Sequence, residues 1–266
     1  MEKLDIPKFE TQKELYDFLV TNKEALITQK CAATKHADGF GSNLVVIDKS
    51  FTEKSAAGSE TEMLVKVVIN TTGIMDSHSD VHIKGLWNKS LKENKRLMHL
   101  QEHKSNEFNK IISSGSDLKA YVKDFTWKEL GYDAEGSTEA LVFESLVKRE
   151  RNPYMFEQYK NDWVDNHSVG MRYVKLNLAI NDADYEKEKS LYDQHIENIA
   201  NKATAEKQGY FWVVTEAKAI EGSAVPNGSN AVTPTLSVGK EIEVGGAGEE
   251  TKDDADTLAI KAFLGI

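Results

Sequence analysis

The segment Ser168–Ile180, SVGMRYVKLNLAI, decides the fold class of this chain. In its first half a large apolar side chain occupies every second position, at Val169, Met171 and Tyr173. Successive side chains of a β-strand point to opposite faces, so this alternation predicts a strand with one buried face.

Four other segments have the β-branched or alternating pattern of strands. They are 44–47 (LVVI), 63–70 (MLVKVVIN), 118–127 (LKAYVKDFTW) and 210–220 (YFWVVTEAKAI). Between them, 71–85 is predicted to be a loop and 86–94 a short helix. Several strands separated by helical segments predict a β-rich α+β domain.

Longer helices are predicted outside these strands. Apolar residues spaced by about 3.6 positions indicate a helix over Thr11–Lys30, and Thr11 with Glu14 has the form of a capping box. The segment 141–163 is ambiguous at first and helical towards its end. The segment 182–208 is rich in Glu, Lys and Ala, and predicts a charged, mostly exposed helix.

Composition divides the chain into three parts. They are an N-terminal helical extension (1–60), a main domain (61–235) and a flexible acidic tail with a short apolar end (236–266). Residues 226–248 are rich in Gly, Ser, Asn and Pro, and residues 249–256 are acidic. Such a stretch buries too little apolar surface to order itself, so we expect a linker there, followed by the apolar end LAIKAFL.

The overall composition is typical of a soluble globular protein. Of 266 residues, 40% are hydrophobic and 29% charged, and the formal charge is −10. This acidic balance argues against a nucleic-acid surface, which needs clustered Lys and Arg. No apolar run approaches the roughly 18 residues of a membrane span, and the charged N-terminus lacks the apolar core of a signal peptide. The single Cys31 excludes an internal disulfide and favours a reducing intracellular compartment.

Residues 97–105, LMHLQEHKS, contain two histidines with a glutamate before the second. On a helix, His99 and His103 would bind zinc and Glu102 would activate water, as in the inverted zinc-protease motif. On a strand, His99 and His103 would share one face and Glu102 would lie on the other. Solvated polar histidines are the third interpretation, and the pattern alone leaves all three open.

Residues 76–82, DSHSDVH, are a second candidate site. In an extended segment its alternating acidic and imidazole side chains would point the same way and could bind a metal. These residues are Asp76, His78, Asp80 and His82. The Ser-rich composition and the following Gly85 favour a solvated loop instead.

Residues 166–171, NHSVGM, place His167 directly before Ser168. Adjacent residues of a strand point to opposite faces, so His167 is a poor base for Ser168 Oγ. If Ser168 is a nucleophile, its base must come from another segment, and His103 or His99 could provide it.

Residues 221–230, EGSAVPNGSN, follow the last predicted strand. Their plain interpretation is a turn-rich exit from a sheet. Glu221 at the end of the strand is, alternatively, a candidate to orient a histidine.

Taken in order, four segments resemble the prohead (capsid-maturation) proteases of tailed bacteriophages. They are TTGIMDSHSDVHIKGLWNKSL (71–91), RLMHLQEH (96–103), HSVGMRYVKL (167–176) and EGSAVPNGSNAVTP (221–234). The resemblance covers Val65–Pro234, and it rests on the order and spacing of the motifs, because each alone is weak. Two positions depart from the family: Lys104 stands where an Asp often follows the histidine, and Met171 where an aromatic residue often follows Ser-Val-Gly.

The resemblance implies a fold similar to that of the herpesvirus assemblins, a mixed β-barrel wrapped by helices. It implies a serine endopeptidase without metal or cofactor, in which Ser168 is the nucleophile and His103 the base. Glu221, with Glu216 as the next choice, would orient the imidazolium. The substrates would be phage scaffold and major capsid proteins, and the protease itself, inside the assembling procapsid in the host cytoplasm. Self-association is a further implication, and neither nucleic acid nor a membrane is an expected partner.

Two other functions remain open from the sequence. A zinc hydrolase would use His99 and His103 with a distant acid. A non-enzymatic scaffolding or capsid-interaction protein is supported by the acidic linker and by the predicted charged helix at 182–208.

Overall fold

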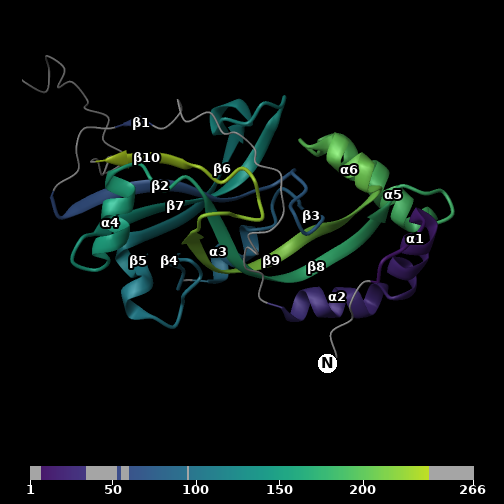
Figure 1. Cartoon of the computed structure of the whole chain (residues 1–266), viewed down its shortest axis with the longest axis horizontal. Coiled ribbons are helices and arrows are strands. Elements are labelled where there is room, and N and C mark those ends of the chain that lie inside the picture. Colours follow the sequence, from purple (N-terminus) through teal and green to yellow (C-terminus); the bar gives the residue numbers. More distant parts are fainter. Residues whose placement is uncertain (1–6, 34–52, 55–59, 95, 240–266) are drawn as a thin grey trace, which may run out of the picture.

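The computed structural model describes residues 7–33, 53–54, 60–94 and 96–239. It is an α+β molecule built from two β-sheets with helices around them (Figure 1). The predicted α+β class is therefore confirmed.

Ten strands and six α-helices make up the described part of the chain. The strands are β1 (Glu53–Lys54), β2 (Glu62–Thr71), β3 (Asp80–His82), β4 (Met98–Gln101), β5 (Ile111–Ser114), β6 (Leu118–Thr126), β7 (Ser137–Lys148), β8 (His167–Ile180), β9 (Tyr210–Ala224) and β10 (Thr235–Gly239). The helices are α1 (Gln12–Thr21), α2 (Lys23–Ala32), α3 (Asn88–Glu93), α4 (Pro153–Lys160), α5 (Glu186–His195) and α6 (Lys202–Gln208). The strands predicted at 63–70, 118–127, 168–180 and 210–220 are confirmed, as is the short helix at 86–94.

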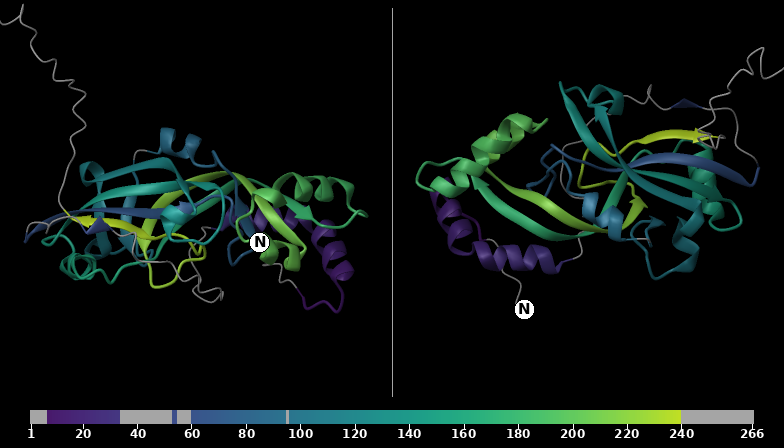
Figure 2. Two further views of the ribbon diagram at one scale, coloured as in Figure 1. Left: turned by 90° about the horizontal axis from the view of Figure 1, so that it is seen from above. Right: turned by 180° about the vertical axis from the view of Figure 1, so that it is seen from behind.

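The two sheets have different strand orders. The first is β1-β10-β2-β7-β6. In the second, the long strand β9 pairs with β8 along one edge, while its other edge pairs first with β3 and then with β4, which continues to β5. Figures 1 and 2 show the β8–β9 pair running out of the two-sheet body towards α5.

The main core lies between the sheets. The alternating apolar residues of β8, Val169, Met171 and Tyr173, are buried in it, as their spacing predicted. They pack in one cluster with the inward side chains of the first sheet. These are Val65, Val67 and Ile69 of β2 and Leu141, Phe143 and Val147 of β7.

The expected closed β-barrel is not found. Among the described residues the hydrogen-bonded ladder of the first sheet ends at β1 and at β6, and it does not continue into the second sheet. A barrel needs one continuous ladder that returns to its first strand. Here the two sheets bury their apolar faces against each other instead, which satisfies the same hydrophobic pattern without closure.

The predicted N-terminal helix is in fact two helices, α1 and α2. They separate at Asn22, whose Nδ2 donates to Phe18 O at 2.9 Å and so caps the end of α1. The predicted capping box is confirmed, because Thr11 Oγ1 accepts from Glu14 N and Glu14 Oε2 accepts from Thr11 N. Leu19 is fully buried in the main core, so these helices pack onto the main domain along β8 (Figure 2).

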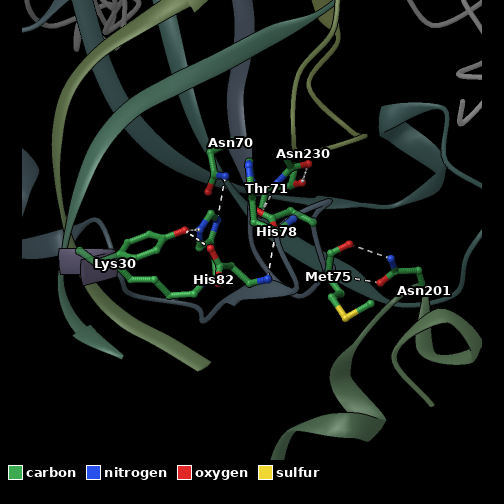
Figure 3. Close-up of polar contacts among 11 residues, drawn as sticks. Lys30, Asn70, Thr71, Met75, His78, His82, Asn201 and Asn230 are labelled. Atoms are coloured by element: carbon green, nitrogen blue, oxygen red, sulfur yellow. Dashed lines mark hydrogen bonds and ion pairs between the residues drawn. The ribbon is translucent and has the colours of Figure 1, made fainter. Parts of the chain in front are cut away.

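The predicted exposed helix at 182–208 is divided and partly buried. Helix α5 ends at His195 and α6 begins at Lys202. Between them, Asn201 Oδ1 accepts from Met75 N at 2.9 Å and Asn201 Nδ2 donates to Met75 O at 2.8 Å (Figure 3). The inward apolar side chains of this region form a second buried cluster with Phe211 and Val213 of β9. They are Tyr192, Ile196, Ile199 and Ala205.

Three other expectations change. The ambiguous segment 141–163 separates into the end of β7 and the helix α4, and the predicted loop at 71–85 contains β3. The predicted linker from Pro226 contains β10, whose backbone pairs with β2 and extends the domain to Gly239. The strand candidate at 44–47, residues 240–248 of the linker and the acidic tail with its apolar end lie outside the described residues.

Candidate active site

The end of β9 lies between β8 and β4. Ser223 of β9 is across from Ser168 of β8 on one side and from Leu100 of β4 on the other. Two residues earlier, Glu221 is across from Gly170 of β8. Paired residues project from the same face of a sheet, so Ser168, Glu221 and Ser223 share one face.

A β-bulge turns the Glu221 side chain to this face. The β8–β9 pairing includes Ala219 and Glu221 and passes over Ile220. Ala219 belongs to the core, and Gly222 also faces it, because a Cβ there would lie 2.6 Å from Phe143 Cε2. Without the extra residue, Glu221 would share the face of Ala219 and point into the apolar core.

Gly170 provides the space that the Glu221 carboxylate occupies. A Cβ built on Gly170 would lie 1.9 Å from Glu221 Oε1 and 2.7 Å from its Cδ. The carboxylate therefore lies directly over the backbone of β8, two residues from Ser168.

His103 reaches this face through a tight turn that follows β4. Glu102 and His103 have φ values of 53° and 58°, and Lys104 N donates to Gln101 O at 3.1 Å. Positive φ at both central residues is the pattern of a type I′ turn. Neither residue is glycine, so the turn carries strain of roughly 1–3 kcal/mol per residue that surrounding contacts must offset.

Three hydrogen bonds connect His103, Glu221 and Ser223. His103 Nδ1 lies 2.6 Å from Glu221 Oε1, and Ser223 Oγ donates to Glu221 Oε2 at 2.6 Å. The backbone N–H of His103 donates to Ser223 Oγ at 3.1 Å. Because a carboxylate only accepts, Nδ1 carries the imidazole proton and Nε2 keeps a lone pair that can take one.

His99 lies on the opposite face from His103. The expectation that both histidines share a face is wrong, because β4 ends at Gln101 and the turn then reverses the chain. His99 points into the protein, where its Nδ1 is 2.9 Å from Ser145 Oγ and its Nε2 is 3.2 Å from Tyr159 Oη. The structure thus brings His103, and not His99, to the face that bears Ser168.

His99 and His167 form a buried hydrogen-bond chain behind the site. His167 Nδ1 donates to Thr233 O at 3.0 Å, so its Nε2 accepts from Tyr159 Oη at 3.0 Å. Tyr159 Oη in turn accepts from His99 Nε2, and this chain of donors and acceptors is satisfied with both imidazoles neutral. Burial lowers the pKa of His167 to about 4, and burial with the nearby His167 holds the pKa of His99 well below its usual range.

These histidines predict acid sensitivity of the fold. The ordinary pKa of histidine is 6.5, and the pKa of His167 in the folded chain is about 4. Between these two pH values the unfolded chain binds a proton at His167 and the folded chain does not. Protonation of His167 therefore does not affect the free energy of unfolding above pH 6.5, and it lowers this free energy as the pH falls from 6.5 to about 4. His167→Gln should make the unfolding free energy less steep in this range, by about 1.4 kcal/mol per pH unit.

Urea unfolding at several pH values measures this difference. Asp76, whose pKa is raised to about 7 by burial and then by the nearby Asp80, acts in the opposite sense. It is common to both proteins, so the difference between the two curves isolates His167. Parallel curves would show that His167 titrates in the folded protein as it does in the unfolded chain.

The DSHSDVH segment is not fully extended, because it turns at Ser79, which has φ 60°. Its inner side chains belong to a buried network in which Lys30 and His82 take part (Figure 3). Lys30 Nζ pairs with Asp80 Oδ1, and Tyr173 Oη donates to Asp80 Oδ2 at 2.7 Å. His82 Nε2 lies 3.3 Å from Tyr173 Oη.

Trp87 sets the direction of this network. Its Nε1 can only donate, and it does so to Asn70 Oδ1 at 3.2 Å, so Asn70 Nδ2 donates to His82 Nδ1 at 2.9 Å. His82 Nε2 then donates to Tyr173. The lone pair of His82 is thereby used inside the network. Across the described residues, no cluster of three or more His, Cys, Asp or Glu side chains is arranged to hold a metal ion.

Glu216 does not take part in the site. It pairs with Lys89 and Lys175 at 2.9 and 3.0 Å. Conversely, Ser223 and Gly170 contact the site and were not singled out by the sequence analysis. The spacing of two between Glu221 and Ser223 is the signal that could have found Ser223, had the strand predicted at 210–220 been extended to Ala224.

No family model, no curated protein and no solved structure shows a significant match to this chain. No helix in the described part is both long and apolar enough to cross a membrane. The functional proposal therefore rests on the site geometry together with the order of the motifs.

Proposed function

We propose that this protein is a serine endopeptidase in which Ser168 is the nucleophile, His103 the base and Glu221 the group that orients the base. The observation that carries the proposal is the 2.6 Å contact between His103 Nδ1 and Glu221 Oε1. These residues are 118 positions apart in the chain, and they meet on the face that bears Ser168.

Each group has a definite role in peptide hydrolysis. Ser168 Oγ attacks the scissile carbonyl while His103 Nε2 takes its proton, and Glu221 stabilises the imidazolium through Nδ1–H. The tetrahedral intermediate then breaks its C–N bond, and His103 gives the proton to the leaving amine. Water, deprotonated by the same histidine, attacks the acyl ester, releases the acid and restores Ser168.

Ser223 is a poorer candidate for the nucleophile than Ser168. Its Oγ already donates to Glu221 and accepts from His103 N. It is 0% exposed, whereas Ser168 retains 4% of its surface. A nucleophile must be able to give its proton to the base, and the proton of Ser223 is directed to the carboxylate.

The motif order supports a more specific proposal, a prohead protease of tailed-bacteriophage assembly. Its substrates would be capsid and scaffold extensions and its own chain, inside the procapsid in the host cytoplasm, and the enzyme would self-associate. The α+β arrangement, with Ser168 on β8 and His103 in the turn after β4, on either side of β9, is compatible with an assemblin-like fold. The zinc-hydrolase alternative loses support, because its two histidines lie on opposite faces.

Intact-mass spectrometry with a fluorophosphonate probe tests the nucleophile. The probe forms an Oγ–P bond and releases fluoride only at a serine whose proton a base removes. We expect one adduct on the wild type at pH 7 to 8, none on Ser168→Ala, and one on the exposed-serine control Ser105→Ala. Incubation without probe should give discrete truncation products in the wild type, slowed by about 10⁴-fold or more in Ser168→Ala.

Other results would reject the assignment. An adduct on Ser168→Ala would move the nucleophile to another residue. A wild type that takes no adduct and stays intact when mixed with capsid and scaffold proteins would favour the non-enzymatic scaffolding role.

A further inference from the structure

Ser223 contacts both the proposed base, His103, and the carboxylate that orients it, Glu221. Its single hydroxyl donates to Glu221 Oε2 at 2.6 Å and accepts from the backbone N–H of His103 at 3.1 Å. The side chain is fully buried, and in the sheet it lies directly across from Ser168. It is therefore placed between the acid, the base and the proposed nucleophile.

We propose that Ser223 is a positioning residue that holds the carboxylate of Glu221 and the backbone of His103 in one arrangement. The inference rests on the proposed function, because positioning matters only if His103 acts as a base. Ser223 itself makes no bond to the substrate in this proposal. It acts through its two partners.

The first contact restricts how the Glu221 carboxylate can rotate. One oxygen accepts from His103 Nδ1 and the other from Ser223, and the carboxylate fills the space over Gly170. Without the hydroxyl, the second oxygen loses this hydrogen bond, although Glu221 is only 1% exposed. The carboxylate would then turn towards another donor and weaken its contact with Nδ1.

The second contact supports the strained backbone of the turn. His103 has φ 58°, a conformation that a non-glycine residue keeps only when its surroundings demand it. Its N–H points at Ser223 Oγ, so this hydrogen bond holds the peptide in the left-handed conformation. Loss of the acceptor would release the turn and move the imidazole away from the face that bears Ser168.

Two measurements on Ser223→Ala test the proposal. The first is the NMR signal of the His103 Nδ1–H proton, assigned from its loss in His103→Gln. The second is the rate of fluorophosphonate labelling of Ser168. We expect the Nδ1–H signal to move upfield and to exchange faster with water as the carboxylate turns away, and labelling to slow about 100-fold. Ser223→Thr, which keeps the hydroxyl, should restore most of both values.

Ser113→Ala is the matched control. Ser113 is also a fully buried strand serine, and its Oγ bonds to Ser145 on the core side of the fold. Its removal should lower the unfolding temperature without changing the Nδ1–H signal of His103. If Ser223→Ala behaved in the same way, Ser223 would be a structural residue only.

The NMR measurement separates this proposal from the proposed function. If the wild type is not labelled but the Nδ1–H signal of His103 still moves upfield in Ser223→Ala, the protease assignment fails and the positioning contact stands. If the wild type is labelled at Ser168 and neither value changes in Ser223→Ala, the protease stands and the positioning role is wrong.

Discussion

The Gly170→Ala variant should fold and lose nearly all of its activity. The Cβ of alanine would lie 1.9 Å from Glu221 Oε1, so the carboxylate must leave its place over β8 and its contact with His103. Loss of the orienting acid in Ser-His-acid sites costs about 10⁴-fold, and we expect a fall of about 10³ to 10⁴-fold here. The rate of fluorophosphonate labelling of Ser168 measures it.

The position of the clash explains why Gly170→Ala should still fold. Gly170 is not in the left-handed region of φ, so alanine fits its backbone, and the displaced atoms are the far end of one side chain. In Gly222→Ala, one residue from Glu221, the new Cβ would meet Phe143 and Ile69 in the core instead. That variant should lose about 1–3 kcal/mol of stability while Glu221 keeps its contacts. The two variants are compared by their labelling rates and their free energies of unfolding. If Gly222→Ala slowed labelling of Ser168 as much as Gly170→Ala does, the assignment of Glu221 would be wrong.

The Lys30→Met variant should lose about 3 kcal/mol of unfolding free energy. Lys30 Nζ pairs with Asp80, whose side chain is 0% exposed, and the lysine itself is only 16% exposed. Removal of the cation leaves a carboxylate buried beside Tyr173, and a buried charge without its partner is costly. It also removes the contact between Lys30 and the ring of Trp212, 5.3 Å away. Urea unfolding followed by circular dichroism measures the change.

An exposed lysine on the neighbouring helix provides the control. Lys13 pairs with Asp184 at 3.0 Å, but their side chains are 62% and 69% exposed, so Lys13→Met should have no measurable effect. Asp80→Asn in the Lys30→Met background should recover part of the loss, because it removes the unpaired charge. A Lys30→Met protein as stable as the wild type would show that α2 is not held by this pair.

Strands and helix starts could be predicted from the sequence because their patterns lie within a few consecutive residues. The alternation around Met171 and Tyr173 identified β8, and the capping box at Thr11 located the start of α1. The prediction of a single helix over 182–208 failed because the segment between α5 and α6 is bonded to a distant backbone. Asn201 binds Met75, 126 positions away, and no pattern within 182–208 records that contact.

The sequence by itself predicted four of the ten described strands, β2, β6, β8 and β9, and the order of its motifs indicated three candidate residues, His103, Ser168 and Glu221. The tertiary structure decided which histidine lies on the face that bears Ser168, because the turn after β4 places His99 and His103 on opposite faces. It also decided the contact between Glu221 and His103, since one bulged residue at Ile220 changes the face of every side chain beyond it. Register and bulges arise from hydrogen bonding and packing between strands that are far apart in the chain. The sequence of one strand alone does not contain this information.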